Sequence, residues 1–269
     1  MKAEDAKKIA DRALDDLTEA LNNGKSEQLT QYLAMLARFH HYSFGNVLLI
    51  LSQKPEATQV AGFSKWKQMG RFVKKGEKGI VIIAPMRFRP KDEHTEGQEQ
   101  TEQAKPILRF RGVFVFDVSQ TDGEALPEPP QTSGDPQHHL LALKALVEER
   151  GITLNHDDLP LGADGVSRGG RISIRAGLEP ANEFSVIVHE FAHELLHRDK
   201  ERSTTKTVRE TEAEAVAFVV CQAIGLETGS AASDYIQLYD GKAETLAASL
   251  DRIQQVASGI IEELQAPKK

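Results

Sequence analysis

The stretch EFSVIVHEFAHELLHR, residues 183–198, determines how the second half of the chain is expected to fold. An apolar run leads into HEFAH, which predicts a buried helix with His189 and His193 one turn apart on the same face. Two imidazoles placed in this way can bind one metal ion, and Glu190 beside them can act as a general base. The pattern predicts the site of a metal-dependent hydrolase, with zinc as the expected ion and manganese or cobalt as alternatives. The other interpretation is a solvated helix that is merely rich in histidine.

His197 lies two helical turns after His189, which is too far along a straight helix to bind the same ion. The sequence LLHRD around it lacks the glycine turn that brings a third histidine to the metal in metzincins. We expect His197 beside the metal ligands or at the mouth of a cleft. The alternative is an ordinary surface histidine.

A third ligand has to come from another helix, and RETEAEAVAF, residues 209–218, supplies carboxylates. Glu210 and Glu214 share one helix face, whereas Glu212 points away by about half a turn. Thr207 and Glu210 also match a capping box, in which the Glu210 carboxylate would bind the helix start and Glu214 would be the ligand. The residues alone leave Glu210 and Glu214 as alternatives.

The composition is that of a folded globular protein. With 269 residues, the chain is long enough for about two domains of roughly 150 residues each. It has no apolar run of the ~18 residues that a bilayer crossing needs, and its N-terminus lacks the apolar core of a signal peptide. The single cysteine, Cys221, lies in an apolar helical stretch and is expected to be a buried, reduced thiol. These features predict a cytoplasmic protein without a membrane partner.

Periodicity divides the chain into a mixed first part and a mostly helical second part, which predicts the α+β class. In the first part we expect helices that contain residues 9–21, 27–39 and 44–53, and strands at 58–63, 79–89 and 106–119. In the second part we expect helices at 137–150, 208–224 and 242–264 besides the helix with the histidines, and short strands at 151–154 and 170–177. A polar, turn-rich stretch at 91–105 is expected to be an exposed insertion.

The stretch TDGEALPEPPQTSGDP, residues 121–136, has the proline-rich composition of a linker. It predicts an N-terminal α+β domain over residues 1–120 and a C-terminal, mostly helical domain with a small sheet over residues 137–269.

A second unusual stretch, FSKWKQMGRFVKKGEKG, residues 63–79, mixes basic and aromatic residues. From 54 to 91 there are ten Lys or Arg residues and only two acidic ones, in a chain whose net charge is -7. Single-stranded nucleic acid is bound by cations along its phosphates and by aromatic rings that stack on its bases. The candidate DNA-binding residues are Tyr42, Phe44, Lys65, Trp66, Lys67, Arg71, Phe72, Lys74, Lys75, Lys78, Arg87 and Arg89. The alternative is that the aromatic residues belong to the core and the lysines merely surround them.

HEFAH followed by ETEAEAVAF resembles the gluzincin metallopeptidases, in which a Glu-x-x-x-Asp pattern supplies the third ligand. The resemblance implies that Glu210 is the ligand. Glu214 then stands where the family has an Asp that supports a zinc histidine, and this difference leaves the two roles partly exchangeable.

Nearly the whole chain resembles the ArdC family of plasmid and phage antirestriction proteins. The resemblance rests on HYSFGNVLLI, the basic segment, VFDVSQTDG, HEFAHELLHR and ETEAEAVAFVVCQAIGL. It implies an N-terminal domain that binds single-stranded DNA, a C-terminal zincin-like metallopeptidase domain, and protection of incoming DNA from host restriction.

Three functions remain open at this point. The first is a single-stranded-DNA-binding antirestriction protein with a zinc metallopeptidase-like domain. The second is a DNA-directed zinc protease, similar to the SprT-like proteins, that degrades a restriction enzyme or another DNA-bound protein. The third is a non-catalytic DNA-binding protein with a structural metal, which would need a fourth protein ligand.

Overall fold

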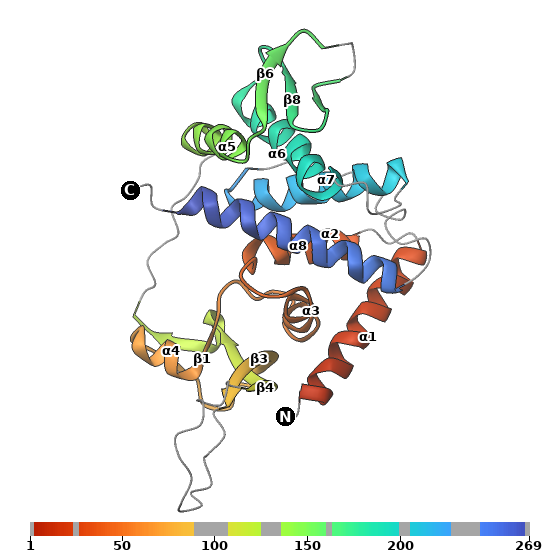
Figure 1. Cartoon of the computed structure of the whole chain (residues 1–269). Coiled ribbons are helices and arrows are strands. Elements are labelled where there is room, and N and C mark those ends of the chain that lie inside the picture. The colour runs from red at the N-terminus through yellow and green to blue at the C-terminus, as the bar shows by residue number, and fades with distance from the viewer. Residues whose placement is uncertain are drawn as a thin grey trace, which may run out of the picture. The chain divides into compact units, whose positions relative to one another are not determined.

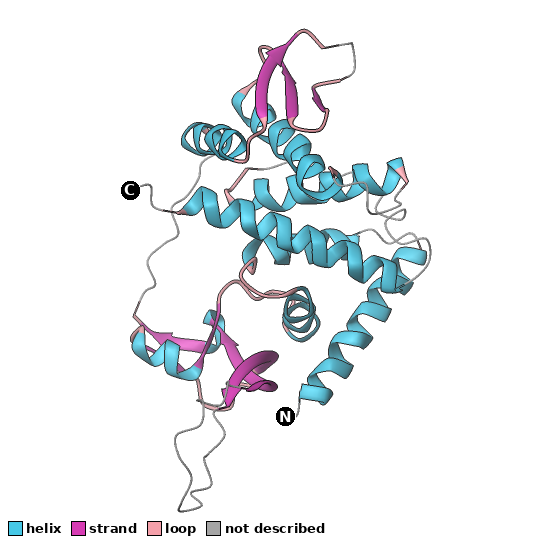
Figure 2. Ribbon diagram, in the orientation of Figure 1, coloured by secondary structure: helices cyan, strands magenta, loops and turns pink. Residues whose placement is uncertain are grey.

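The structure, a computed structural model, describes residues 3–23, 27–88, 107–124, 136–159, 163–198, 205–226 and 243–266. Helices and sheets both occur (Figures 1 and 2), which confirms the predicted α+β class. The chain forms two compact units: unit 1 comprises residues 1–13 and 49–124, and unit 2 comprises residues 14–48 and 125–269. The predicted insertion at 91–105 and most of the predicted linker lie outside the described residues.

Three helices open the chain: α1 (Ala3–Asn22), α2 (Glu27–Arg38) and α3 (Phe44–Gln53). Their apolar positions recur every three or four residues, so each helix has one face that packs into a core. The predicted helices are thereby confirmed. Residues 14–48 belong to unit 2 together with the C-terminal part of the chain. The two units are therefore not contiguous in sequence, and the domain boundaries at 120 and 137 stay a prediction.

The sheet of unit 1 has the order β1-β4-β3, with antiparallel pairing throughout. Its strands are β1 (Val60–Gly62), β3 (Ile80–Phe88) and β4 (Ile107–Asp117), which confirms the three predicted strands. Ala6, Leu49 and Val81 form a buried cluster at which the first helix, the third helix and the sheet meet.

Three short elements of unit 1 were not expected from the sequence, because three to six residues carry too little periodicity to identify them. They are α4 (Phe63–Gln68) and the two-stranded ribbon of β2 (Arg71–Val73) and β5 (Thr121–Gly123). The residues of β5 are the first three of the predicted linker. Just before β5, the buried side chain of Asp117 accepts hydrogen bonds from the amides of Thr58 and Ser119, at 2.8 and 2.9 Å. These bonds fix the turn of η1 (Val118–Gln120).

Unit 2 contains the longer helices of the C-terminal part and a three-stranded sheet. The helices are α5 (Gln137–Glu149), α6 (Pro180–His197), α7 (Lys206–Ala223) and α8 (Ala243–Gln265). The strands are β6 (Thr153–Asp157), β7 (Gly165–Ser167) and β8 (Arg171–Arg175), in the order β6-β8-β7. The middle strand β8 runs parallel to β6 and antiparallel to β7, which the sequence analysis did not predict.

Helix α6 lies at the centre of unit 2, where α5, α7, α8 and the sheet pack against it. It begins at Pro180, a residue favoured in the first turn because its missing N–H would have no partner there. Phe184, Ile187, Val188 and Phe191 bury one face of the helix. This burial holds the remaining face, with its two histidines, at a fixed place.

No helix among the described residues combines the length and the apolar character that a bilayer crossing requires.

Candidate functional site

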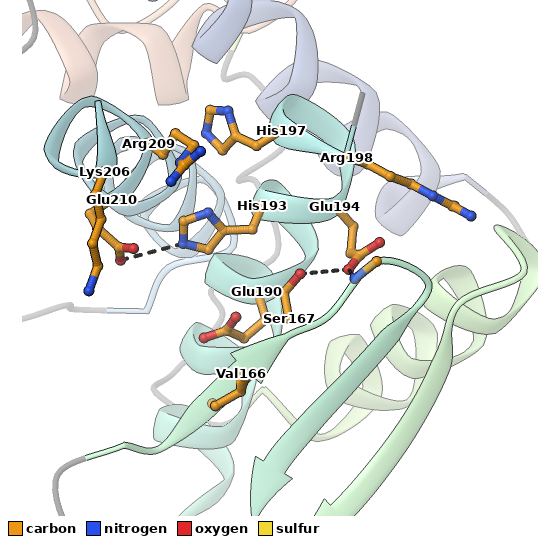
Figure 3. A pocket seen from close by; sticks show the side chains of 12 residues that line it. Val166, Ser167, Glu190, His193, Glu194, His197, Arg198, Lys206, Arg209 and Glu210 are labelled. Atoms are coloured by element: carbon orange, nitrogen blue, oxygen red, sulfur yellow. Dashed lines mark hydrogen bonds and ion pairs between the residues drawn. The ribbon is translucent and has the colours of Figure 1, made fainter. Parts of the chain in front are cut away.

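The imidazoles of His189 and His193 and the carboxylate of Glu210 converge between α6 and α7 (Figure 3 shows His193 and Glu210). The Nε2 atoms of the two histidines are 3.1 Å apart. The Oε2 atom of Glu210 lies 3.6 Å from Nε2 of His189 and 3.5 Å from Nε2 of His193. Ligand atoms bound tetrahedrally at about 2.0–2.1 Å are separated by roughly 3.3–3.4 Å. The triangle therefore fits a tetrahedral divalent metal with one position open.

Glu214 lies on the same helix face as Glu210 but contacts the other nitrogen of a ligand histidine. Its Oε2 atom is 3.3 Å from Nδ1 of His189. A carboxylate at this position fixes the tautomer and the orientation of the imidazole, so that Nε2 presents its lone pair to the metal. The geometry therefore favours Glu210 as the metal ligand and Glu214 as the residue that orients His189.

The capping box suggested by Thr207 and Glu210 does not form. Helix α7 begins two residues earlier than expected, at Lys206, and Thr205 is its N-cap, accepting a hydrogen bond from the amide of Val208 at 3.2 Å. Glu210 then lies in the second turn, beyond the reach of a capping side chain. That alternative was wrong because three threonines, Thr204, Thr205 and Thr207, stand close together and the sequence does not say which one ends the loop.

His197 is neither a ligand nor a surface residue. Its side chain is 7% exposed and its Nε2 atom lies 3.6 Å from the fully buried carboxylate of Glu212. Glu212 therefore points away from the metal ligands, as its half-turn offset predicts. The pair joins the last turn of α6 to α7 one turn beyond His193.

Glu190 is buried beside the ligands, against the short strand β7. Burial raises the pKa of Glu190, and this effect outweighs the opposing charge of His189. A Cβ atom on Gly165 would lie only 2.7 Å from Cγ of Glu190, so the strand can pack this closely only with glycine at that position. A carboxyl group with a raised pKa beside a bound metal would be suited to accept and return protons.

The two candidate ligand histidines differ in their affinity for protons. Burial and the neighbouring charge of His189 lower the pKa of His193 to about 4. Burial would also lower the pKa of His189, but the hydrogen bond to Glu214 and the charges of three carboxylates raise it instead. His193 therefore stays neutral over a wider pH range, as a metal ligand must be, whereas a metal that binds His189 would compete with a more tightly held proton.

Glu194 is a structural residue of the site that the sequence analysis missed. Its buried carboxylate accepts hydrogen bonds from Oγ of Ser167 at 2.6 Å and from the amides of Gly169 and Gly170 at 2.8 and 2.7 Å. Both glycines have positive φ, 64° and 90°, a conformation that other residues rarely adopt. The bonds attach the β7–β8 turn to α6 and so fix the strand over Glu190. The only signal in the sequence is the Gly-Gly pair.

A cleft of about 580 Å³ opens between β7 and its turn on one side and α7 on the other. Glu190, His193 and Glu210 line it, and His197 and Glu194 complete its wall (Figure 3). Three cations also line the cleft: Arg198, Lys206 and Arg209.

In the basic segment, Trp66 has the opposite environment from the one predicted. It is 1% exposed, and its indole N–H donates a hydrogen bond to the carbonyl oxygen of Phe116 at 2.8 Å. A ring enclosed in this way cannot stack on a base. Trp66 is therefore a core residue that anchors α4 to β4, which is a correction of its predicted DNA-binding role.

Several other candidates of unit 1 are exposed. Phe72 is 57% exposed, and Lys65, Lys67, Lys75 and Lys78 are exposed as well. Two cations have structural contacts: Arg71 bonds to the side chain and carbonyl of Thr121, and Lys74 bonds to the carbonyl of Ser119. The side chain of Arg87 and the whole of Arg89 lie outside the described residues.

Tyr42 and Phe44 belong to unit 2. Tyr42 packs edge-on against Phe39, with the ring centroids 6.1 Å apart, and Phe44 packs against the buried Tyr32 at 5.9 Å. Both rings are partly buried in these contacts, and a DNA-binding role for them stays a prediction.

Three exposed aromatic rings of unit 1 were not among the predicted residues. Phe63, Phe110 and Phe114 are 57%, 60% and 50% exposed. Phe110 and Phe114 lie on the same face of β4, because side chains alternate along a strand. A Cβ on Gly79 would lie 2.9 Å from Cβ of Phe114, which places this ring beside the end of the basic segment. The even spacing of Phe110 and Phe114 in RFRGVFVF was the signal for these two rings, but it also fits a strand with a buried face.

Residues 5–116 match the family model of the N-terminal domain of anti-restriction factor ArdC. The chain also resembles two crystal structures of the antirestriction ArdC protein from R388 plasmid. The metal-free structure has a TM-score of 0.58 and 20% identity, over 95% of this chain and 97% of that one. The Mn(II)-bound structure has a TM-score of 0.56 and 18% identity, over 96% and 98%.

An uncharacterised protein of Bacillus anthracis is 27% identical over 96% of this chain. The chain spans about half of that protein, 51% of its length. The family match of the N-terminal domain and the shared fold of the remainder agree with each other. Residues 5–116 therefore match the N-terminal domain of the ArdC family, and the chain shares its fold with the ArdC protein from R388 plasmid.

Proposed function

We propose that this chain is an antirestriction protein that binds single-stranded DNA through unit 1 and carries a metal-dependent peptidase-like site in unit 2. The observation that carries the proposal is the triangle of His189, His193 and Glu210, with Glu190 buried beside it. Two histidines and a glutamate are a ligand set of catalytic zinc sites. The related ArdC protein of plasmid R388 binds Mn(II), which supports a divalent ion and leaves zinc and manganese as the first candidates.

The residues around the ligands suit hydrolysis of an amide. A bound divalent metal would polarise a carbonyl group and lower the pKa of a water molecule. Glu190 would accept a proton from the attacking water and return it to the leaving nitrogen, for which its raised pKa is suited. Strand β7 is an edge strand of its sheet, so an extended peptide can pair with its free backbone groups. This strand would align the peptide along the cleft.

A structural metal is the weaker alternative. Structural zinc sites are closed by four protein ligands, whereas among the described residues only three ligand atoms converge here. The buried Glu190 next to these ligands also has no use in a purely structural site, which favours the candidate function of a protease acting on a DNA-bound protein.

The DNA-binding part of the proposal rests on unit 1. Exposed cations of the basic segment would follow the phosphates, and the exposed rings of Phe63, Phe72, Phe110 and Phe114 would stack on bases. Arg109 and Arg111 are also exposed on β4, on the face opposite Phe110 and Phe114, and add positive charge to unit 1.

Glu190→Gln is the variant that separates the two parts of the function. It keeps the size of the side chain but removes the base, so we expect metal content and affinity for an oligothymidylate to stay unchanged. Cleavage of a DNA-bound test protein should then be lost. Glu149→Gln, an exposed change on α5 with the same loss of charge, is the control.

Protection of incoming DNA in cells decides whether hydrolysis is needed. If Glu190→Gln still protects, the protein works by binding alone, and the protease candidate is rejected. If neither zinc nor manganese binds the purified protein, the proposed metal site itself is rejected.

A further inference from the structure

Three cations of the cleft have no role in holding the metal. Lys206 lies on the same face of α7 as Glu210, which it precedes by four residues, and Arg209 lies three residues after Lys206. Arg198 follows the last residue of α6. All three side chains line the cleft, with Lys206 and Arg209 on either side of Glu210 (Figure 3).

The cations face the cleft from two sides. A guanidinium nitrogen of Arg198 lies 3.6 Å from the place that a Cβ on Gly170 would occupy, so it rests on the β7–β8 turn. Lys206 and Arg209 project from the opposite wall, formed by α7. A group that enters the cleft between the strand and α7 therefore meets positive charge on both sides.

The carboxylates of the cleft do not neutralise these cations. Glu194 is occupied by three hydrogen-bond donors from the β7–β8 turn, and Glu210 contacts the ligand histidines. Within the described part of the chain, no acidic side chain lies within 4 Å of Arg198, Lys206 or Arg209. With a divalent metal added, the charges of the cleft sum to a positive value. Such a cleft attracts an anion and holds it by charge-assisted hydrogen bonds.

We propose that Lys206, Arg209 and Arg198 form a subsite for an acidic side chain of a peptide substrate, next to the metal site. This inference rests on the proposed peptidase function and adds a substrate class to it. A peptide fits better than a nucleic acid here, because the edge strand β7 offers backbone pairing along the same cleft. The subsite would select peptides with Asp or Glu close to the scissile bond.

Binding of two peptide hydroxamates tests the subsite without relying on turnover. The peptides chelate the metal through the same group and differ only in one neighbouring side chain, Glu or Gln. On protein loaded with zinc or manganese, we expect the Glu peptide to bind about tenfold or more tightly than the Gln peptide, since a hydrogen bond between charged groups is worth that much. The dissociation constants are measured by fluorescence polarisation.

Paired double variants assign the preference to the cleft. In Lys206→Gln with Arg209→Gln, the preference for the Glu peptide should disappear while the Gln peptide binds as before. Arg168→Gln with Arg171→Gln removes the same charge at exposed positions that do not line the cleft, and it should keep the preference.

Four other outcomes would overturn the inference. Equal affinity of the two peptides would refute an acidic preference, and a preference that survives in the cleft variant would refute the assigned cations. Displacement of the Glu peptide, but not of the Gln peptide, by a short oligothymidylate would show that the subsite takes phosphate instead. If neither peptide binds and no metal is retained, the proposed function fails first and the inference falls with it.

Discussion

The HEFAH helix and the FSKWK segment show how differently a sequence pattern can constrain a structure. In the helix, His189 and His193 converge to 3.1 Å, as their spacing predicts. In the segment, Trp66 is buried in the core of unit 1 although lysines stand on both sides of it. The difference is that one helical turn fixes the geometry of two ligands, whereas a mixture of basic and aromatic residues fixes none. Only a pattern that implies a geometry predicts a site.

The largest effects are expected at the metal ligands, where Glu210 and Glu214 can be compared directly. Glu210→Gln removes a ligand, so we expect affinity for zinc or manganese to fall by ~10³-fold or more. Glu214→Gln removes only the support of His189 and should cost about 10–100-fold. Calorimetry or competition with a chelator measures both constants. The two variants lose the same charge on the same helix. A larger loss of metal affinity in Glu214→Gln than in Glu210→Gln would therefore show that the assigned roles are exchanged.

Trp66 and Phe72 make the corresponding comparison in unit 1. Trp66→Ala removes a buried ring and should lower the free energy of unfolding by about 3–5 kcal/mol. Phe72→Ala removes an exposed ring, so stability should change by less than about 1 kcal/mol, while affinity for single-stranded DNA should fall by about 1–3 kcal/mol if the ring stacks on a base.

Chemical denaturation and binding to an oligothymidylate give the two readouts. Leu141→Ala, which truncates another exposed apolar side chain, is the control and should alter neither. An unchanged DNA affinity of the Phe72 variant would remove this residue from the proposed DNA-binding surface.

The long elements could be predicted from the sequence because their periodicity extends over several turns or strand residues. Helices α2 and α7 begin or end within about two residues of the expected limits. The short elements could not be predicted, since β7 has three residues and no alternation to detect. Yet β7 forms one wall of the cleft. A site can therefore depend on elements that leave almost no trace in the sequence.

The candidate metal site also has one part that could be predicted from the sequence and another that could not. Contacts within one helix were predictable, as the pair of histidines shows. Contacts between elements depend on how those elements pack. The sequence therefore left open whether Glu210 or Glu214 is the third ligand, and it hid the role of Glu194. The presence of Glu194 directly after His193 gave no sign that its carboxylate would accept bonds from a turn about 25 residues earlier.

The smallest expected effect concerns the pH dependence of metal binding, which distinguishes the two ligand histidines. Neighbouring carboxylates raise the pKa of His189, while burial and the charge of His189 lower the pKa of His193 to about 4. Between pH 5 and that raised pKa, only His189 carries a proton that a metal must displace. Metal affinity should then increase about tenfold per pH unit and level off once pH exceeds the pKa of His189.

In Glu214→Gln, the hydrogen bond and the charge that raise the pKa of His189 are removed, so the levelling-off should begin at a lower pH. Calorimetry in buffers of different ionisation enthalpy counts the protons released and should find about one below the levelling-off point. A release of two protons would show that both histidines are protonated in the metal-free protein. The two imidazoles would then be equivalent, and Glu214 would not distinguish one ligand from the other.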